Sequence, residues 1–211
     1  QAIFQDFSSL MRNHLDMRYQ INPLNSIYAA LDYTVIPSSD KPQGPMQAVG
    51  TDAQIARSPT TPPLLVVVLG ETARSQNFSL NGYARDTNPL LAKENVTSFS
   101  RVTSCGTSTA ESLPCMFSHL NRAEFNARQN EFENVFDVMQ RAGYGVIWID
   151  NQSGCKTLCD RIPTLSTARL NQAAHCPGDE CRDSIMLSEA PAQIAKLSSQ
   201  QRQRGVVVVM R

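Results

Sequence analysis

The hydroxyl-rich segment Thr103–Cys115 combines residue types that can bind and transfer a phosphoryl group. Ser108 and Thr109 precede an apolar stretch, so either is well placed to cap the amino end of a helix. Such an end attracts phosphate through its free backbone N–H groups and the helix dipole. A metal that lowers the pKa of a threonine hydroxyl there would make it a nucleophile, because a free hydroxyl is too weakly acidic at neutral pH. The alternative is an ordinary helix cap.

Glu71 places a carboxylate just beyond the apolar run Leu64–Leu69. Pro63 and Gly70 bound this β-branched run, which predicts a strand buried on both faces. An unpaired charge at the edge of a sheet is costly, so the carboxylate needs a partner, and a metal ion is one candidate. The alternative is a place in the first turn of a following helix, where acidic residues are favoured.

The loop Asp150–Lys156 follows a second apolar run, Gly145–Ile149. Small polar side chains and a lysine after a buried strand suit an anionic phosphate ester. A solvated turn would have the same composition, so both interpretations stay open.

The order of the predicted elements brings these segments to one edge of a sheet. We expect alternating strands and helices at residues 64–69, 130–142, 145–149, 183–200 and 205–210, with Pro191 weakening the second helix. This alternation is typical of a largely parallel sheet covered by helices, an α/β fold. Ligands bind outside the carboxyl ends of parallel strands, so Glu71 and Asp150–Asn151 should share one rim.

The residues before the first strand are of two kinds. Residues 1–36 carry apolar side chains at helical spacing, and residues 37–63 form a linker rich in proline. The domain proper is predicted at 64–211. Because its last strand is followed only by Arg211, we expect this domain to be truncated at its C-terminus.

Composition excludes some classes of function. The chain has 19 basic and 19 acidic side chains, which gives no electrostatic footprint for nucleic acid. It contains no run of about 18 apolar residues, so no membrane-spanning helix is predicted. Six cysteines lie in three local groups, at Cys105 and Cys115, Cys155 and Cys159, and Cys176 and Cys181. Disulfides in an oxidising compartment are the simpler interpretation, and metal binding is the weaker one.

Four stretches together resemble the lipid A phosphoethanolamine transferases. They are Gly70–Tyr83, Asn88-Pro89, Ser104–Ser118 and Asp150–Lys156, and the resemblance extends to Asn22–Tyr28. This family includes the mobile colistin-resistance enzymes and belongs to the alkaline-phosphatase/sulfatase superfamily. The resemblance implies the N-terminal half of a three-layer α/β/α domain of that superfamily, preceded by short helices and a linker.

The resemblance also assigns roles to residues. It implies that Glu71 binds Zn²⁺ and that Thr109 is both a zinc ligand and the nucleophile that becomes phosphoethanolamine-modified. It places Thr107, Asn151, Ser153 and Lys156 in the pocket for the head groups of donor and acceptor. It also implies disulfides within the three local cysteine pairs.

The implied reaction moves phosphoethanolamine from phosphatidylethanolamine to a phosphate of lipid A, which confers resistance to polymyxins such as colistin. The implied location is the periplasmic face of the bacterial inner membrane, reached through N-terminal membrane helices that this sequence lacks, and the expected state is a monomer. Another acceptor, a core heptose or glycan, and an inactive remnant remain alternatives. The family's Ser-Asp-His-Gly-Glu zinc motif is absent from the sequence, so we expect the 211 residues alone to be inactive and to bind zinc poorly.

Overall fold

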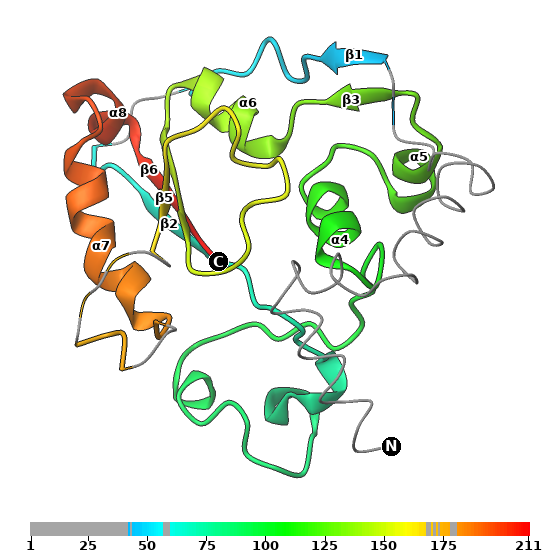
Figure 1. Cartoon of the computed structure of the whole chain (residues 1–211), viewed down its shortest axis with the longest axis vertical. Helices are drawn as coiled ribbons and strands as arrows, with labels where there is room; N and C mark the ends of the chain where they lie inside the picture. The colour runs from blue at the N-terminus through cyan, green and yellow to red at the C-terminus, as the bar shows by residue number, and fades with distance from the viewer. Residues whose placement is uncertain are drawn as a thin grey trace, which may run out of the picture. The chain divides into compact units, whose positions relative to one another are not determined.

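A parallel sheet of four strands forms the centre of the described structure, a computed structural model (Figure 1). The structure describes residues 42, 44–56, 60–167, 170, 172, 174–177 and 181–211. The chain divides into the units 1–44 and 45–211, and every described helix and strand lies in the second unit except for Gly44, where the first strand begins. The predicted helical segment 1–36 lies outside the described residues.

The strand order is β2-β6-β4-β5, with every neighbouring pair parallel. The strands are β2 (Leu64–Val68), β4 (Gly145–Asp150), β5 (Thr164–Ser166) and β6 (Val206–Met210). Although β6 is the last in sequence, it lies between β2 and β4, and Val208 is in register with Val66 and with Ile147. All the carboxyl ends therefore meet at one rim of the sheet.

Alternate side chains of β4 and β6 enter two separate hydrophobic cores. Val146 and Trp148 pack on one face with Phe136 of α6 (Val135–Ala142) and with Leu113 of α4 (Thr109–Met116). The period of two along a strand sends the intervening residues of β4 and β6 to the opposite face. In Figure 1 the sheet is seen nearly edge-on, with α6 and α4 to one side of it.

The second core is formed with the helices that precede β6. Ile147 and Ile149 pack there against Ile185 of α7 (Ser184–Ala195), and Leu197 closes the cluster just before α8 (Ser199–Arg204). Figure 1 shows α7 and α8 on the side of the sheet away from α4 and α6. The chain therefore has the three-layer α/β/α arrangement that was predicted.

The prediction that the first strand is buried on both faces is wrong. Strand β2 is at the edge of the described sheet, and its Leu64 and Val68 are 60% and 71% exposed. The strands β4 and β6 are buried along their whole lengths, as predicted. The helices α6, α7 and α8 pack mainly on these two strands, which leaves β2 less covered.

Both predicted helices are shorter than the apolar periodicity indicated. Residues Asn130–Phe132 form β3, which pairs with β1 (Gly44–Gln47), and α6 begins only after Asn134. The predicted helix at 183–200 is divided, because Ser198 caps a new helix, α8. In each case a polar cap, rather than the apolar pattern, determines where the helix begins. The strand β1 also lies within the predicted linker.

The remaining elements are short, and disulfides hold several of the loops between them. They are α5 (Arg122–Ala127) and the 3₁₀ helices η1 (Ser75–Asn77), η2 (Ser79–Asn81) and η3 (Leu91–Lys93). All three predicted cysteine pairs form disulfides: Cys105–Cys115, Cys155–Cys159 and Cys176–Cys181.

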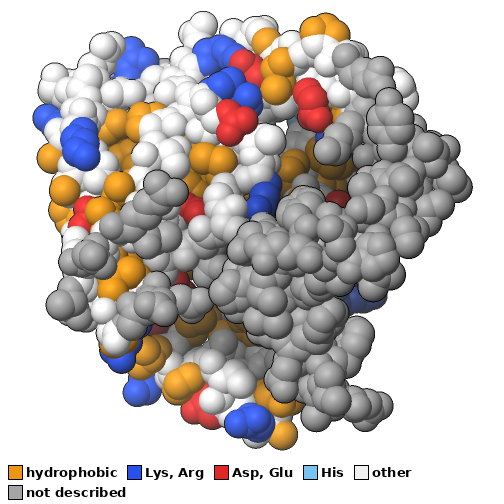
Figure 2. Space-filling view, in the orientation of Figure 1, with side chains coloured by type: hydrophobic (Ala, Val, Ile, Leu, Met, Phe, Trp, Pro, Cys, Tyr) orange, Lys and Arg blue, Asp and Glu red, His pale blue; other side chains and the backbone are white. Residues whose placement is uncertain are grey.

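On the surface seen in Figure 2, basic and acidic side chains are interspersed rather than gathered in a patch of one sign. Within the described part of the chain, no helix has the length and apolar character needed to cross a membrane.

The buried helix cap at Asn134 provides a test of this packing. Its side chain accepts from Phe136 N at 2.9 Å and donates to Leu158 O at 3.0 Å, which ties α6 to the loop after β4. We expect Asn134→Ala to lower the free energy of unfolding by about 2 to 3 kcal/mol, because it removes a cap and leaves a buried carbonyl without a donor.

The exposed cap Asn121, which accepts from Glu124 N at 3.0 Å, is the matched control. Asn121→Ala should cost about 0.5 to 1 kcal/mol. Urea unfolding of both variants measures the difference, and equal losses would contradict the role given to Asn134.

Candidate active site at the carboxyl ends of the strands

Three charged side chains lie at the carboxyl ends of three adjacent strands. Glu71 follows β2, Asp150 ends β4 and Arg211 follows β6 directly. The ladder continues past the strands, because Leu69 N donates to Met210 O at 2.8 Å and Asn151 N donates to Arg211 O at 2.6 Å. The backbone therefore fixes where each of the three charged side chains starts.

The hydroxyl of Thr109 reaches the carboxylate of Glu71. Its Oγ1 lies 3.2 Å from Oε1 and 3.3 Å from Oε2, so its proton is shared between the two oxygens. Thr109 is the first residue of α4, and Ser108 is the cap, accepting from Glu111 N at 3.4 Å. The disulfide Cys105–Cys115 ties the loop before this helix to the helix itself. Of the two caps that the sequence allowed, Ser108 is the cap, and Thr109 is left free to face Glu71.

Thr72, the residue after Glu71, also donates a hydrogen bond to this carboxylate. Its hydroxyl donates to Glu71 Oε1 at 3.1 Å, and its φ of 53° is in the left-handed region. A non-glycine residue adopts that conformation at a cost, and such strain is concentrated at functional sites. The turn after β2 is thus shaped to aim Glu71 at α4.

Arg211 is the buried cation of the site. Its side chain is 3% exposed, its Nη2 lies 2.9 Å from Glu71 Oε2, and its Nη1 lies 3.6 Å from Asp150 Oδ1. Nη1 also donates to the carbonyl oxygen of Gly154 at 2.6 Å. Two carboxylates therefore share one guanidinium at the rim.

These contacts set the ionisation of Glu71. Partial burial raises the pKa of its carboxyl, but the hydrogen bonds from Arg211, Thr72 and Thr109, with the charge of Arg211, outweigh this effect. The pKa is therefore held below its ordinary value of 4.5. A carboxylate of this kind stays ionised and is a better ligand for a cation than an acceptor of a proton.

Glu71 and Thr109 lie in the wall of a cleft of about 1040 Å³. Glu71, Thr107 and Thr109 are part of its polar lining, together with Arg211. Apolar side chains also line the cleft, and the exposed ones among them include Phe99 and Val102, which are 73% and 69% exposed. The cleft thus combines an ionised carboxylate and hydroxyl groups with exposed apolar side chains.

Three residues predicted to line this pocket have other partners in the structure. The amide of Asn151 donates to Cys181 O and to Asp183 Oδ1, each at 2.9 Å. Lys156 Nζ lies 2.8 Å from Ser153 O and 3.2 Å from Ser153 Oγ. None of the three lines the cleft at Glu71, and their role in head-group binding remains a prediction.

From the sequence, Arg211 was not identified as a site residue, and Asp150 was named only as part of the loop Asp150–Lys156. The signal for both is their place at the carboxyl ends of predicted parallel strands, where a charged residue faces the crevice.

The described residues at the cleft offer few ligands to a metal ion. Glu71 and Thr109 offer two adjacent oxygen ligands, whereas zinc sites have three or four protein ligands. Elsewhere in the described part of the chain, Cys155, Cys159 and Asp160 are grouped closely enough to hold a metal, but the two sulfurs form a disulfide and are not thiolates. Taken alone, these residues do not complete a zinc site.

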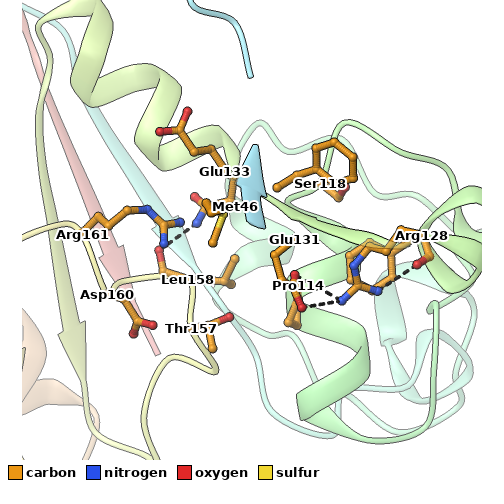
Figure 3. A pocket seen from close by; sticks show the side chains of 13 residues that line it. Met46, Pro114, Ser118, Arg128, Glu131, Glu133, Thr157, Leu158, Asp160 and Arg161 are labelled. Atoms are coloured by element: carbon orange, nitrogen blue, oxygen red, sulfur yellow. Dashed lines mark hydrogen bonds and ion pairs between the residues drawn. The ribbon is translucent and has the colours of Figure 1, made fainter. Parts of the chain in front are cut away.

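A second cavity of about 170 Å³ lies between α5, β3 and the loop after β4. Figure 3 shows Arg128 beside Glu131 at one side of it and Arg161 at the other. Each arginine already has a carboxylate, at 3.3 Å for Arg128 and Glu131 and at 2.6 Å for Arg161 and Asp137. Neither offers a free charge to a substrate, so the chemistry is assigned to the larger cleft.

Comparisons with known proteins identify relatives of this chain. The sequence model of the sulfatase family matches residues 63–210, and the model described as phosphoethanolamine transferase EptA/EptB matches residues 1–36. Phosphoethanolamine transferase EptA of Escherichia coli (strain K12) is 37% identical over 210 residues, which are 98% of this chain and 37% of that protein.

Two further proteins give the same result. Phosphatidylethanolamine transferase Mcr-1 of Escherichia coli is 40% identical over 203 residues, which are 88% of this chain and 36% of that protein. The structure of the integral membrane protein lipooligosaccharide phosphoethanolamine transferase A (EptA) from Neisseria meningitidis matches with a TM-score of 0.71 and 34% identity. That match covers 99% of this chain and 38% of that protein. The chain thus spans little more than a third of the length of these relatives.

The lowered pKa of Glu71 predicts how stability depends on pH. A group whose folded pKa lies below its unfolded value contributes stability above the unfolded value, and this contribution is lost as the pH falls through the folded pKa. We expect Glu71→Gln to be less stable than the wild type at neutral pH. The difference should close as the pH falls below 4.5, where the wild-type carboxyl becomes protonated.

Urea unfolding at a series of pH values measures that difference. Glu131→Gln, which removes an exposed carboxylate from an i,i+3 ion pair, is the control. A difference between Glu71→Gln and the wild type that stays constant down to about pH 3 would contradict the ionic contact with Arg211.

Proposed function

The chain belongs to the sulfatase family, and from this premise we propose that it forms part of the catalytic domain of a phosphoethanolamine transferase. The donor is phosphatidylethanolamine, the acceptor is a phosphate of lipid A, and the nucleophile is Thr109. The observation that carries the proposal is the contact of 3.2 Å between the Thr109 hydroxyl and Glu71, at the start of α4 and inside the cleft.

The reaction we propose has two displacements at phosphorus. The Thr109 oxygen forms a bond to the phosphorus of the donor, the bond from phosphorus to the glycerol oxygen breaks, and diacylglycerol leaves with a proton. An oxygen of a lipid A phosphate then attacks the same phosphorus, the bond from phosphorus to the Thr109 oxygen breaks, and Thr109 regains a proton from the lipid A phosphate or from water. The covalent intermediate is therefore a phosphoethanolamine ester of threonine.

The surroundings of Thr109 support its role in phosphoryl transfer. It is the first residue of α4, where backbone N–H groups without intrahelical partners attract an anionic phosphate. The apolar wall with Phe99 and Val102 suits the diacylglycerol part of the donor, which would otherwise expose hydrocarbon to water. One cleft thus offers a nucleophile, an anion-binding helix end and a surface for lipid.

We propose Zn²⁺ as the cofactor, with Glu71 and Thr109 as two of its ligands. A bound zinc ion would lower the pKa of the threonine hydroxyl, which is too weakly acidic to react at neutral pH. The ionised state of Glu71 favours this role over that of a general base, because its low pKa makes it a poor proton acceptor. These two ligands are fewer than the three or four protein ligands that zinc sites have.

The remaining roles are proposals as well. Thr107 lines the cleft and is assigned to the head groups, together with Asn151, Ser153 and Lys156 from the neighbouring loop. Three disulfides favour an oxidising compartment, and we place the protein at the periplasmic face of the inner membrane as a monomer.

The test is to map the covalent intermediate. The protein that contains this chain, with any sequence that flanks it, is incubated with phosphatidylethanolamine and zinc, and its peptides are examined by mass spectrometry. We expect one phosphoethanolamine group on Thr109, none in Thr109→Ala, and a reduced amount in Thr109→Ser. The 211 residues alone should show weak zinc binding and no transfer, because they supply two ligands in the described region.

Thr61→Ala is the control, since Thr61 is exposed and precedes β2, at the end of the strand opposite the cleft. It should be modified at Thr109 like the wild type. An adduct on another residue, or transfer that survives in Thr109→Ala, would show that a different nucleophile is used. Full turnover by the isolated chain would show that its metal site is complete.

A further inference from the structure

We propose that the guanidinium of Arg211 fills a cation site made of oxygen atoms and competes there with a divalent metal ion for Glu71. This inference deepens the proposed function and rests on it for the metal-binding role of Glu71. Arg211 is in this sense a positioning residue, because it acts on the nucleophile through Glu71.

The oxygen atoms around the guanidinium come from three parts of the chain. They are Oε2 of Glu71 at 2.9 Å, the carbonyl oxygen of Gly154 at 2.6 Å and Oδ1 of Asp150 at 3.6 Å. The side chains of Arg211 and Asp150 are 3% and 4% exposed, so water screens little of their interaction. Carboxylate and carbonyl oxygens are also the ligands that hard divalent cations use.

The two oxygens of Glu71 have different partners. Oε1 accepts from Thr72 at 3.1 Å and from Thr109 at 3.2 Å, whereas the contact of Oε2 with Arg211, at 2.9 Å, is its shortest. A metal ion on Oε2 would take the place of the guanidinium. A metal ion on Oε1 would lie close to a buried positive charge, and the repulsion would weaken its binding.

The buried carboxylate of Asp150 requires a positively charged partner, which Arg211 provides. Without it, Asp150 would be a buried carboxylate with no counter-ion, since its other partners are Gly154 N at 2.8 Å and Trp148 Nε1 at 3.5 Å. A buried unpaired charge is costly, so the site needs a cation. Arg211 supplies it from within the chain, and its removal would leave two carboxylates and a carbonyl facing one space.

The experiment is zinc binding by isothermal titration calorimetry on the 211-residue chain. We expect Arg211→Ala to bind Zn²⁺ at least about tenfold more tightly than the wild type, because it opens the oxygen site and removes the repulsion. Arg211→Lys keeps the positive charge and should stay near the wild-type affinity. An affinity of Arg211→Ala equal to or weaker than that of the wild type would overturn the proposal.

Two further variants test which residues cause the increase in zinc affinity. In Arg211→Ala combined with Asp150→Asn most of the gain should disappear, because one of the oxygen ligands loses its charge. Arg128→Ala removes an arginine from the second cavity and should leave zinc affinity unchanged. A gain that persists in the double variant, or that appears in Arg128→Ala, would overturn the proposal.

If Arg211→Ala does not fold, rescue of its folding by added cations tests the proposal. If Arg211→Ala is unfolded alone, zinc or millimolar guanidinium ion should restore cooperative thermal unfolding, because either cation fills the oxygen site. Failure of both to restore it would overturn the proposal. These readouts require no transfer reaction, so an absent Thr109 adduct would count against the proposed function and not against this inference.

Discussion

The buried guanidinium of Arg211 holds the working edge of this protein together. Arg211 directly follows β6, the strand between β2 and β4. Its guanidinium contacts one carboxylate beyond the end of each of these two neighbouring strands, Glu71 after β2 and Asp150 at the end of β4. The contact with Asp150 joins two buried side chains, so water screens it little, whereas the side chain of Glu71 is 41% exposed and its contact is partly open to solvent. The orientation of Glu71, and through it the partner of Thr109, follows from this constraint.

The parallel sheet makes the constraint possible. Parallel strands bring their carboxyl ends to one rim, so residues separated by 140 positions in the chain, Glu71 and Arg211, can share a salt bridge. The helix α4 approaches the same rim with its amino end, and its cap Ser108 leaves Thr109 facing the carboxylate. The hydroxyl of Thr109, an ionised carboxylate and a buried cation are thus held at one rim by the backbone. Preorganisation of this kind is what phosphoryl transfer requires of a protein.

The sequence predicted those parts that depend on local patterns. The strands β4 and β6 are apolar along nearly their whole lengths, and continuous β-branched runs are typical of strands that lie inside a parallel sheet. The rule that ligands bind at the carboxyl ends of parallel strands then placed Glu71 and Asp150 at one rim. The local residues offered Ser108 or Thr109 at the start of a helix, and the resemblance to a family singled out Thr109. The caps at Asn134 and Ser198 were missed because a short polar residue inside an apolar period gives a weak signal.

Other features depend on contacts between distant residues. The exposure of β2 follows from its position at the sheet edge, and no property of its five residues distinguishes it from β6. The place of Arg211 directly after a predicted strand indicates the rim of the sheet, but its partners are two carboxylates on other strands, which no single segment reveals. Tertiary pairing of charges, unlike the periodicity of apolar residues, cannot be read from a single segment.

The most direct test of this arrangement is an experimental structure of the chain at a resolution that separates side-chain oxygens. We predict the Thr109 hydroxyl within hydrogen-bonding distance of Glu71, with Arg211 on the other carboxylate oxygen and Asp150 behind it. Side chains of Glu71 and Thr109 that point to different faces of the domain would contradict the central claim.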